Sequence, residues 1–91
     1  MVHMVCRTRV RDFSIWKTVF DSHKQAHRKA GLLLENLWRS IDEPNNVFFV
    51  FEVEDIDRAN QFINSPDSVK AGDDSGVIDG EYHFVESVPA Y

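Results

Sequence analysis

Hydrophobic side chains recur along this 91-residue chain with two different periods. Between residues 12 and 31 they return at steps of three and four, the spacing of one helix face. Elsewhere apolar residues alternate with polar ones, or β-branched and aromatic residues dominate, which is typical of strands. These strand segments are residues 2–10, 32–41, 47–54 and 81–88.

The helix predicted over residues 12–31 has a start signal and a stop signal. Asp12 is placed to cap free backbone N–H groups, and Gly31 is placed to end the helix in a left-handed turn. One face of this helix carries three aromatic side chains followed by two histidines: Phe13, Trp16, Phe20, His23 and His27. This face predicts either a core with a polar edge or the wall of a pocket.

The other segments complete a βαββαβ order within one domain, residues 1–91. Residues 42–46 are rich in turn formers and predict a hairpin, and Asp55 is placed to cap a helix over residues 56–64. Ser65 and Pro66 begin a short helix that ends at Gly72, and residues 71–80 predict a loop. The order predicts an α+β, ferredoxin-like fold: a four-stranded antiparallel sheet with its helices on one face and the first and third strands in the centre.

Strand periodicity then assigns side chains to the two faces of the sheet. The face predicted to lie under the helices is almost wholly apolar and comprises Met4, Cys6, Thr8, Leu34, Phe49, Phe51, Val53 and Phe84. The opposite face also carries large apolar side chains: Val5, Leu33, Leu37, Phe48, Val50 and Val85. Because no element remains to cover this second face, we expect a homodimer in which two sheets pack face to face.

The chain resembles the dimeric α+β barrel superfamily, which includes antibiotic-biosynthesis-monooxygenase-like and small polyketide-cyclase-like proteins. The resemblance lies in residues 10–13, Trp16, residues 20–21, His23, residues 30–31, the aromatic third strand running into Asp55, then Ala59, Phe62 and residues 65–66. It implies a ferredoxin-like protomer, a closed dimeric barrel and a small-molecule pocket between helices and sheet. It also implies, for some members, oxygenase chemistry without a cofactor.

Candidate site residues follow from these placements. We expect His23 to accept a proton, Asn36 to stabilise an oxyanion and Glu86 to supply a carboxylate. The side chains expected to hold an aromatic or polyketide-like ligand are Trp16, Phe20, His27, Trp38 and Tyr82. The alternative interpretation places both tryptophans in the core, because pockets and cores are both apolar and aromatic.

A metal site is a weaker hypothesis. His23 and His27 are four residues apart, the spacing of two metal ligands on a helix, and Glu86 is a candidate third ligand. The competing interpretation is that the histidines are structural residues at the wet edge of the helix. We expect no cofactor.

Two other features have structural explanations. Arg7 and Arg9 are expected to pair with Glu52 and Glu54 across the sheet, and Cys6 is expected to be a small buried side chain.

Composition narrows the function classes. A net charge of −5 disfavours a nucleic-acid partner, and no segment predicts a membrane span or a signal peptide, so we expect a soluble, cytoplasmic protein. Two main hypotheses remain open: a cofactor-independent monooxygenase or cyclase, and a non-catalytic dimeric binding or accessory module whose pocket is filled by Trp16, Phe20 and Trp38.

Overall fold

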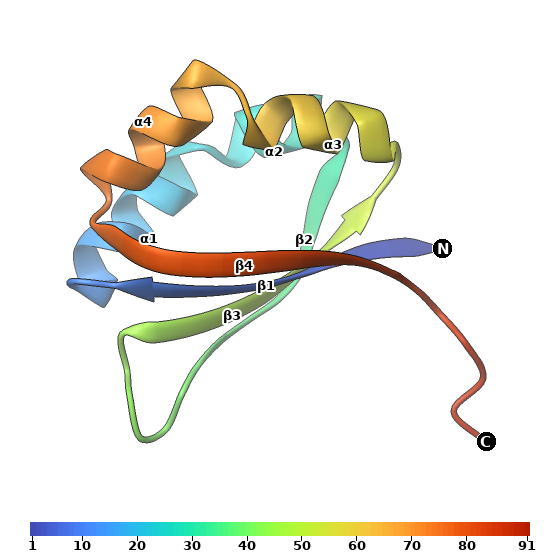
Figure 1. Ribbon diagram of the computed structural model, residues 1–91, viewed down its shortest axis with the longest axis horizontal. Coiled ribbons are helices and arrows are strands. Elements are labelled where there is room, and N and C mark those ends of the chain that lie inside the picture. Colours follow the sequence, from blue (N-terminus) through green and yellow to red (C-terminus); the bar gives the residue numbers. More distant parts are fainter.

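A computed structural model describes residues 1–91 and has the expected two-layer architecture (Figure 1). The elements, in chain order, are β1 (Val2–Val10), α1 (Phe13–Ser22), α2 (Lys24–Lys29), β2 (Leu32–Arg39), β3 (Asn46–Val53), α3 (Ile56–Ile63), α4 (Pro66–Asp74) and β4 (Val77–Glu86). The four strands form one antiparallel sheet in the order β2-β3-β1-β4. The α+β, ferredoxin-like fold and the central position of the first and third strands are therefore confirmed.

All four helices lie on one face of the sheet, and no element covers the other face (Figure 1). Eleven buried apolar side chains form the core between the two layers: Met4, Cys6, Val10, Trp16, Ala30, Leu32, Val47, Phe49, Phe51, Val53 and Ala59. Alternation along β1 and β3 supplies most of this core, as the sequence predicts. No helix is long and apolar enough to cross a membrane.

The expected start and stop signals act as predicted at most helix ends. The carboxylates of Asp12 and Asp55 accept hydrogen bonds from the backbone N–H groups of Ile15 and Arg58. Gly31 has a φ of 75°, so it takes the left-handed conformation that ends α2. These local signals fix where the chain leaves one layer and enters the other.

The helix predicted over residues 12–31 is in fact two helices that meet at His23. In an unbroken helix the N–H of His23 would donate to the carbonyl of Val19, but here it donates to Phe20. The Ser22 hydroxyl and the His23 ring both contact the Val19 carbonyl instead, at 2.6 and 2.9 Å. Polar side chains that compete for a helix carbonyl in this way interrupt the regular pattern.

The end of α4 was also predicted wrongly. The helix continues through Gly72 to Asp74, and Gly76, with a φ of 82°, makes the turn into β4. β4 therefore begins at Val77, within the segment predicted as a loop. Gly72 does not end the helix, because a glycine can occupy a helical position at a modest cost in stability.

A β-bulge in β2 reverses the predicted facing of its second half. Leu34 pairs with Phe51, but the next paired residue is Asn36, which lies opposite Val50. One extra residue, Glu35, therefore shifts every later side chain to the other face of the sheet. Leu37, expected on the uncovered face, packs against the core, whereas Asn36 and Trp38, expected under the helices, lie on the uncovered face.

Candidate functional site

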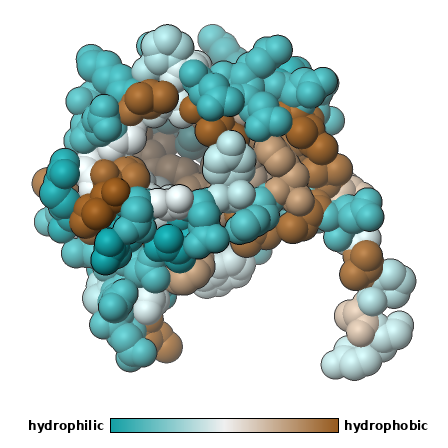
Figure 2. Space-filling view, in the orientation of Figure 1, coloured by the Kyte–Doolittle hydropathy of each residue, from teal (hydrophilic) through white to brown (hydrophobic).

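A cavity of about 320 Å³ lies between the helices and the sheet. Figure 2 shows the molecule hollowed between the helical layer and β4. Thirteen of its 21 lining residues are hydrophobic, which is the usual composition of a small-molecule pocket. The polar residues that line it are Thr8, His23, His27, Ser68, Ser75, Glu81 and Tyr82.

Aromatic rings form one wall of this cavity. The Trp16 and Phe20 rings are stacked with centroids 4.7 Å apart, and Phe49 packs against both at 5.7 and 5.2 Å. Trp16 is only 4% exposed, so it belongs to the core and to the cavity wall at once. The two interpretations that the sequence left open for Trp16 are therefore compatible.

His27 is packed within a cluster of phenylalanines. Its ring centroid lies 5.0 Å from that of Phe20, 5.1 Å from that of Phe51 and 5.6 Å from that of Phe62. Burial, with a smaller contribution from the nearby charge of His23, lowers the pKa of His27 to about 4. The ring is therefore neutral near pH 7 and presents one N–H donor and one acceptor nitrogen.

His23 is held by the helix break in a defined tautomer. Its Nδ1 lies 2.9 Å from the carbonyl oxygen of Val19, which can only accept a hydrogen bond. Nδ1 must therefore carry the proton in the neutral ring, and Nε2 keeps its lone pair. A lone pair on Nε2 makes this side chain a proton acceptor at the cavity.

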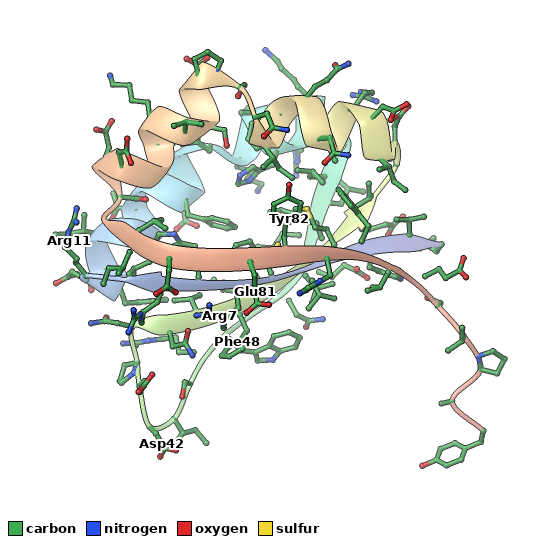
Figure 3. All side chains as sticks on the ribbon, viewed as in Figure 1. Arg7, Arg11, Asp42, Phe48, Glu81 and Tyr82 are labelled. Atoms are coloured by element: carbon green, nitrogen blue, oxygen red, sulfur yellow. The ribbon has the colours of Figure 1, made fainter.

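Tyr82 supplies a hydroxyl group from the sheet. It lies opposite Cys6 on β1, and Figure 3 shows it on the helix side of β4, whereas Arg7, Phe48 and Glu81 lie on the other side. Cys6 also lines the cavity, and burial raises the pKa of its thiol to about 12. Cys6 therefore behaves as a neutral apolar side chain, in agreement with its expected role.

The structure does not bring together all the residues expected in the site. Trp16, Phe20, His23, His27 and Tyr82 line the cavity, but Asn36 and Trp38 do not, because the bulge turns them to the opposite face. Glu86 is not at the cavity either, because it lies at the end of β4 opposite Val2. The prediction that His23, Asn36 and Glu86 share one site is therefore wrong.

The metal hypothesis loses its third ligand for the same reason. No group of three His, Cys, Asp or Glu side chains in the protein is arranged to hold a metal ion. His23 and His27 both line the cavity, but no third ligand accompanies them.

Sequence reasoning missed the hydroxyl groups that α4 and the segment after it bring to the cavity. Ser68 lies on α4, and Ser75 is 4% exposed and donates its hydroxyl proton to the Gly72 carbonyl at 3.0 Å. The predicted loop over residues 71–80 concealed Ser75. Ser68 was on the helix predicted from Ser65 and Pro66, but the sequence did not show that this helix borders the cavity.

The uncovered face of the sheet keeps its large apolar side chains. Val5, Leu33, Phe48 and Val85 are each 36–41% exposed there, and Trp38 is 51% exposed. Val50, on β3, shares this face. Trp38 thus takes the place that was expected for Leu37.

Charged side chains on this face form pairs other than those expected. Arg7 contacts Asp79 and Glu81 of β4 at 3.2 and 3.0 Å, and Arg9 contacts Asp79 at 2.5 Å. Glu52 lies opposite His3, so the strand register keeps it away from the arginines. Arg9 and Arg7 lower the pKa of Asp79, and His83 and Arg7 lower that of Glu81.

A hydrogen-bonded chain crosses the same face near the start of β1. His3 Nδ1 lies 2.5 Å from a carboxylate oxygen of Glu35, and His3 Nε2 lies 3.1 Å from the Ser87 hydroxyl. Glu35 is the extra residue of the bulge, so this contact ties the bulge in β2 to β1. We interpret these two hydrogen bonds of His3 as a structural link on the uncovered face.

These features define a small α+β protein with an aromatic cavity between one helical layer and one sheet. Solved structures with the same architecture include SnoaB, a cofactor-independent oxygenase from Streptomyces nogalater (16% identity, TM-score 0.77, 98% of this chain and 94% of that chain). The fold also matches an antibiotic biosynthesis monooxygenase, with 15% identity and a TM-score of 0.71 over 98% of this chain and 100% of that chain. It likewise matches an uncharacterized NIPSNAP domain protein from Burkholderia xenovorans, with 11% identity and a TM-score of 0.70 over 100% of this chain and 98% of that chain.

The expected resemblance to antibiotic-biosynthesis-monooxygenase-like proteins is confirmed at the level of the fold. No protein-family model matches the chain, and no curated protein does. Because one fold serves many activities, function has to be argued from the cavity.

Proposed function

We propose that this protein is a homodimer whose cavity binds an uncharged hydroxylated aromatic molecule and promotes its reaction with dioxygen without a cofactor. The observation that carries the proposal is the pairing of a largely apolar, aromatic cavity with two imidazoles at its wall. His27 is neutral, and no lysine or arginine lines the cavity. Such a lining favours a flat, neutral ring system over a carboxylate or phosphate.

His23 is the base in this proposal. Its Nε2 accepts the proton of the phenolic hydroxyl, and dioxygen oxidises the resulting phenolate. One oxygen atom forms a bond to a ring carbon and becomes the second carbonyl of a quinone. The other leaves as water with the hydrogen of that carbon and the proton returned by His23. The hydroxyl of Tyr82 and the N–H of His27 are available as hydrogen-bond donors to the anion. The presence of a cofactor-independent oxygenase among the structural neighbours supports this chemistry.

The non-catalytic alternative predicts that Trp16, Phe20 and Trp38 fill the space between helices and sheet. Trp16 and Phe20 do pack together, but a cavity remains beside them and Trp38 lies on the other face. The geometry therefore favours an open pocket over a filled one.

The dimer is proposed from the uncovered face. Its five half-exposed apolar side chains in one layer are unusual for a monomer, and the flanking ion pairs of Arg7 and Arg9 supply the polar rim typical of interfaces. Native mass spectrometry tests this part directly. A dimer supports the proposal, and a monomer at micromolar concentration refutes it.

The cavity is tested with 1-naphthol and with dihydroxynaphthalenes as probes. In a Trp38→Phe background Trp16 is the sole tryptophan, so saturable quenching of its fluorescence reports binding at the cavity. Oxygen uptake in the presence of a dihydroxynaphthalene reports the reaction. We expect His23→Gln to lower the rate about 100-fold or more, the usual contribution of a general base, with binding changed less than about three-fold.

His83→Gln is the matched control, because His83 is exposed on β4 and contacts Glu81 rather than the cavity. It should leave both readouts unchanged. Binding without oxygen uptake would replace the enzyme with a binding module, and the absence of saturable quenching would refute the proposed pocket.

A further inference from the structure

A second concave site lies on the outer side of the aromatic cluster, between α2 and the edge strand β2. This groove has a volume of about 510 Å³ and nine lining residues. Four of them, Phe20, His27, Leu32 and Phe51, also line the inner cavity, so these side chains form a partition between the two. The groove is therefore separate from the cavity but shares its aromatic wall.

The sheet side of this groove is apolar and open to solvent. Leu34 is 46% exposed, shares the helix-covered face with Phe51 and belongs to an edge strand that no other strand covers. Together with Phe20 and Phe51, it offers a surface suited to a hydrocarbon or aromatic body.

The helix side of the groove is positively charged. Lys24 and Arg28 are one helical turn apart on α2, and no carboxylate lies within 4.0 Å of either. The one acidic residue of the groove, Asp21, is already paired with Lys17 at 2.6 Å. The groove thus presents two uncompensated cations on a chain whose net charge is −5.

We propose that this groove binds a small amphipathic organic anion, an aryl or alkyl carboxylate or sulfonate. The apolar body lies on Leu34 and the aromatic partition, and the acidic group lies between Lys24 and Arg28. Charge complementarity selects this ligand over a neutral one. Lys24, Arg28 and Leu34 do not line the inner cavity, so recognition of the acidic group does not depend on the proposed oxygenase activity.

Two fluorescent probes that differ in one group test the proposal. 8-Anilinonaphthalene-1-sulfonate carries the sulfonate, and N-phenyl-1-naphthylamine has the same ring system without it. We expect Lys24→Gln with Arg28→Gln to weaken sulfonate binding about five- to twenty-fold, given the usual strength of exposed ion pairs, while binding of the neutral probe changes less than about two-fold. Raising the salt concentration from about 0.05 to 0.5 M should weaken only the sulfonate.

Lys70→Gln is the matched control, because Lys70 is an exposed cation on α4 that does not line the groove. It should leave both probes unaffected. A Leu34→Asp variant should weaken both probes at the groove, since it places a charge on the apolar surface.

Three results would overturn the proposal. The first is equal sulfonate affinity in the double variant and the parent protein. The second is an equal loss of affinity for both probes in the double variant, which would mean that Lys24 and Arg28 do not bind the acidic group. The third is a sulfonate affinity that falls as protein concentration rises, which would show that a second copy of the chain occupies the groove. Because Trp16 quenching and oxygen uptake report on the inner cavity, failure here is distinguishable from failure of the proposed function.

Discussion

The partly buried imidazole of His27 predicts a loss of stability on mild acidification. In the unfolded chain a histidine titrates near pH 6.5, whereas burial lowers the pKa of His27 in the folded protein to about 4. Between these two values the unfolded state binds more protons than the folded state. The free energy of unfolding must therefore fall as the pH drops from about 6.5 toward 4, and it is unaffected by this group at higher pH.

The magnitude follows from the two pKa values. Integrating the proton difference from neutral pH to about pH 5 gives about 2 kcal/mol. Because the ring is partly exposed, solvent screening reduces the expected loss to about 1 kcal/mol. For a domain of this size, 1 kcal/mol corresponds to a change in melting temperature of about 4–8 °C.

Urea denaturation at several pH values, with the parent protein and His27→Gln, measures this effect. The variant has no titrating ring, so its stability should fall about 1 kcal/mol less than that of the parent between about pH 7 and 5. That range avoids the carboxylates of Asp79 and Glu81, whose lowered pKa values place their titration at more acidic pH. An NMR titration of His27 in the parent protein gives the same information if the variant is too unstable.

Parallel pH profiles for the parent and His27→Gln would refute the argument. So would a measured pKa above about 6, since the ring would then be solvated rather than packed among Phe20, Phe51 and Phe62.

Three further substitutions test other parts of the structure. Trp38→Ala should leave naphthol affinity at the cavity unchanged and should weaken self-association at least ten-fold in sedimentation experiments. Weaker naphthol binding would contradict the bulge assignment. Asp12→Ala should cost about 1 kcal/mol in urea denaturation by removing the cap of α1, and Asp12→Asn should restore most of it. Gly31→Ala should cost about 1–2 kcal/mol, because the φ of 75° disfavours a side chain and the added Cβ would lie 3.1 Å from that of Glu54; an unchanged melting temperature would show that this turn can relax.

Local rules in the sequence determined the order of elements, most of their ends and the fold. Asp12, Asp55 and Gly31 act through backbone groups a few residues away, so their effects could be predicted without any tertiary contact. Alternation along β1 and β3 likewise placed Met4, Cys6, Phe49, Phe51 and Val53 under the helices, because the pairing between these two strands is regular. The helix face from Phe13 to His27 was predicted as either a core with a polar edge or a pocket wall, and its aromatic and imidazole side chains line or adjoin the cavity.

Only the tertiary structure decided which polar residues share the cavity. A single unpaired residue, Glu35, moves Asn36 and Trp38 away from it, and nothing in the alternation of β2 reveals a bulge. The pairing of Arg7 with β4 rather than β3 depends on strand register, and the outer groove depends on how α2 lies along β2. Period and capping are properties of neighbouring residues, whereas register and cavity lining depend on contacts between segments distant in the chain.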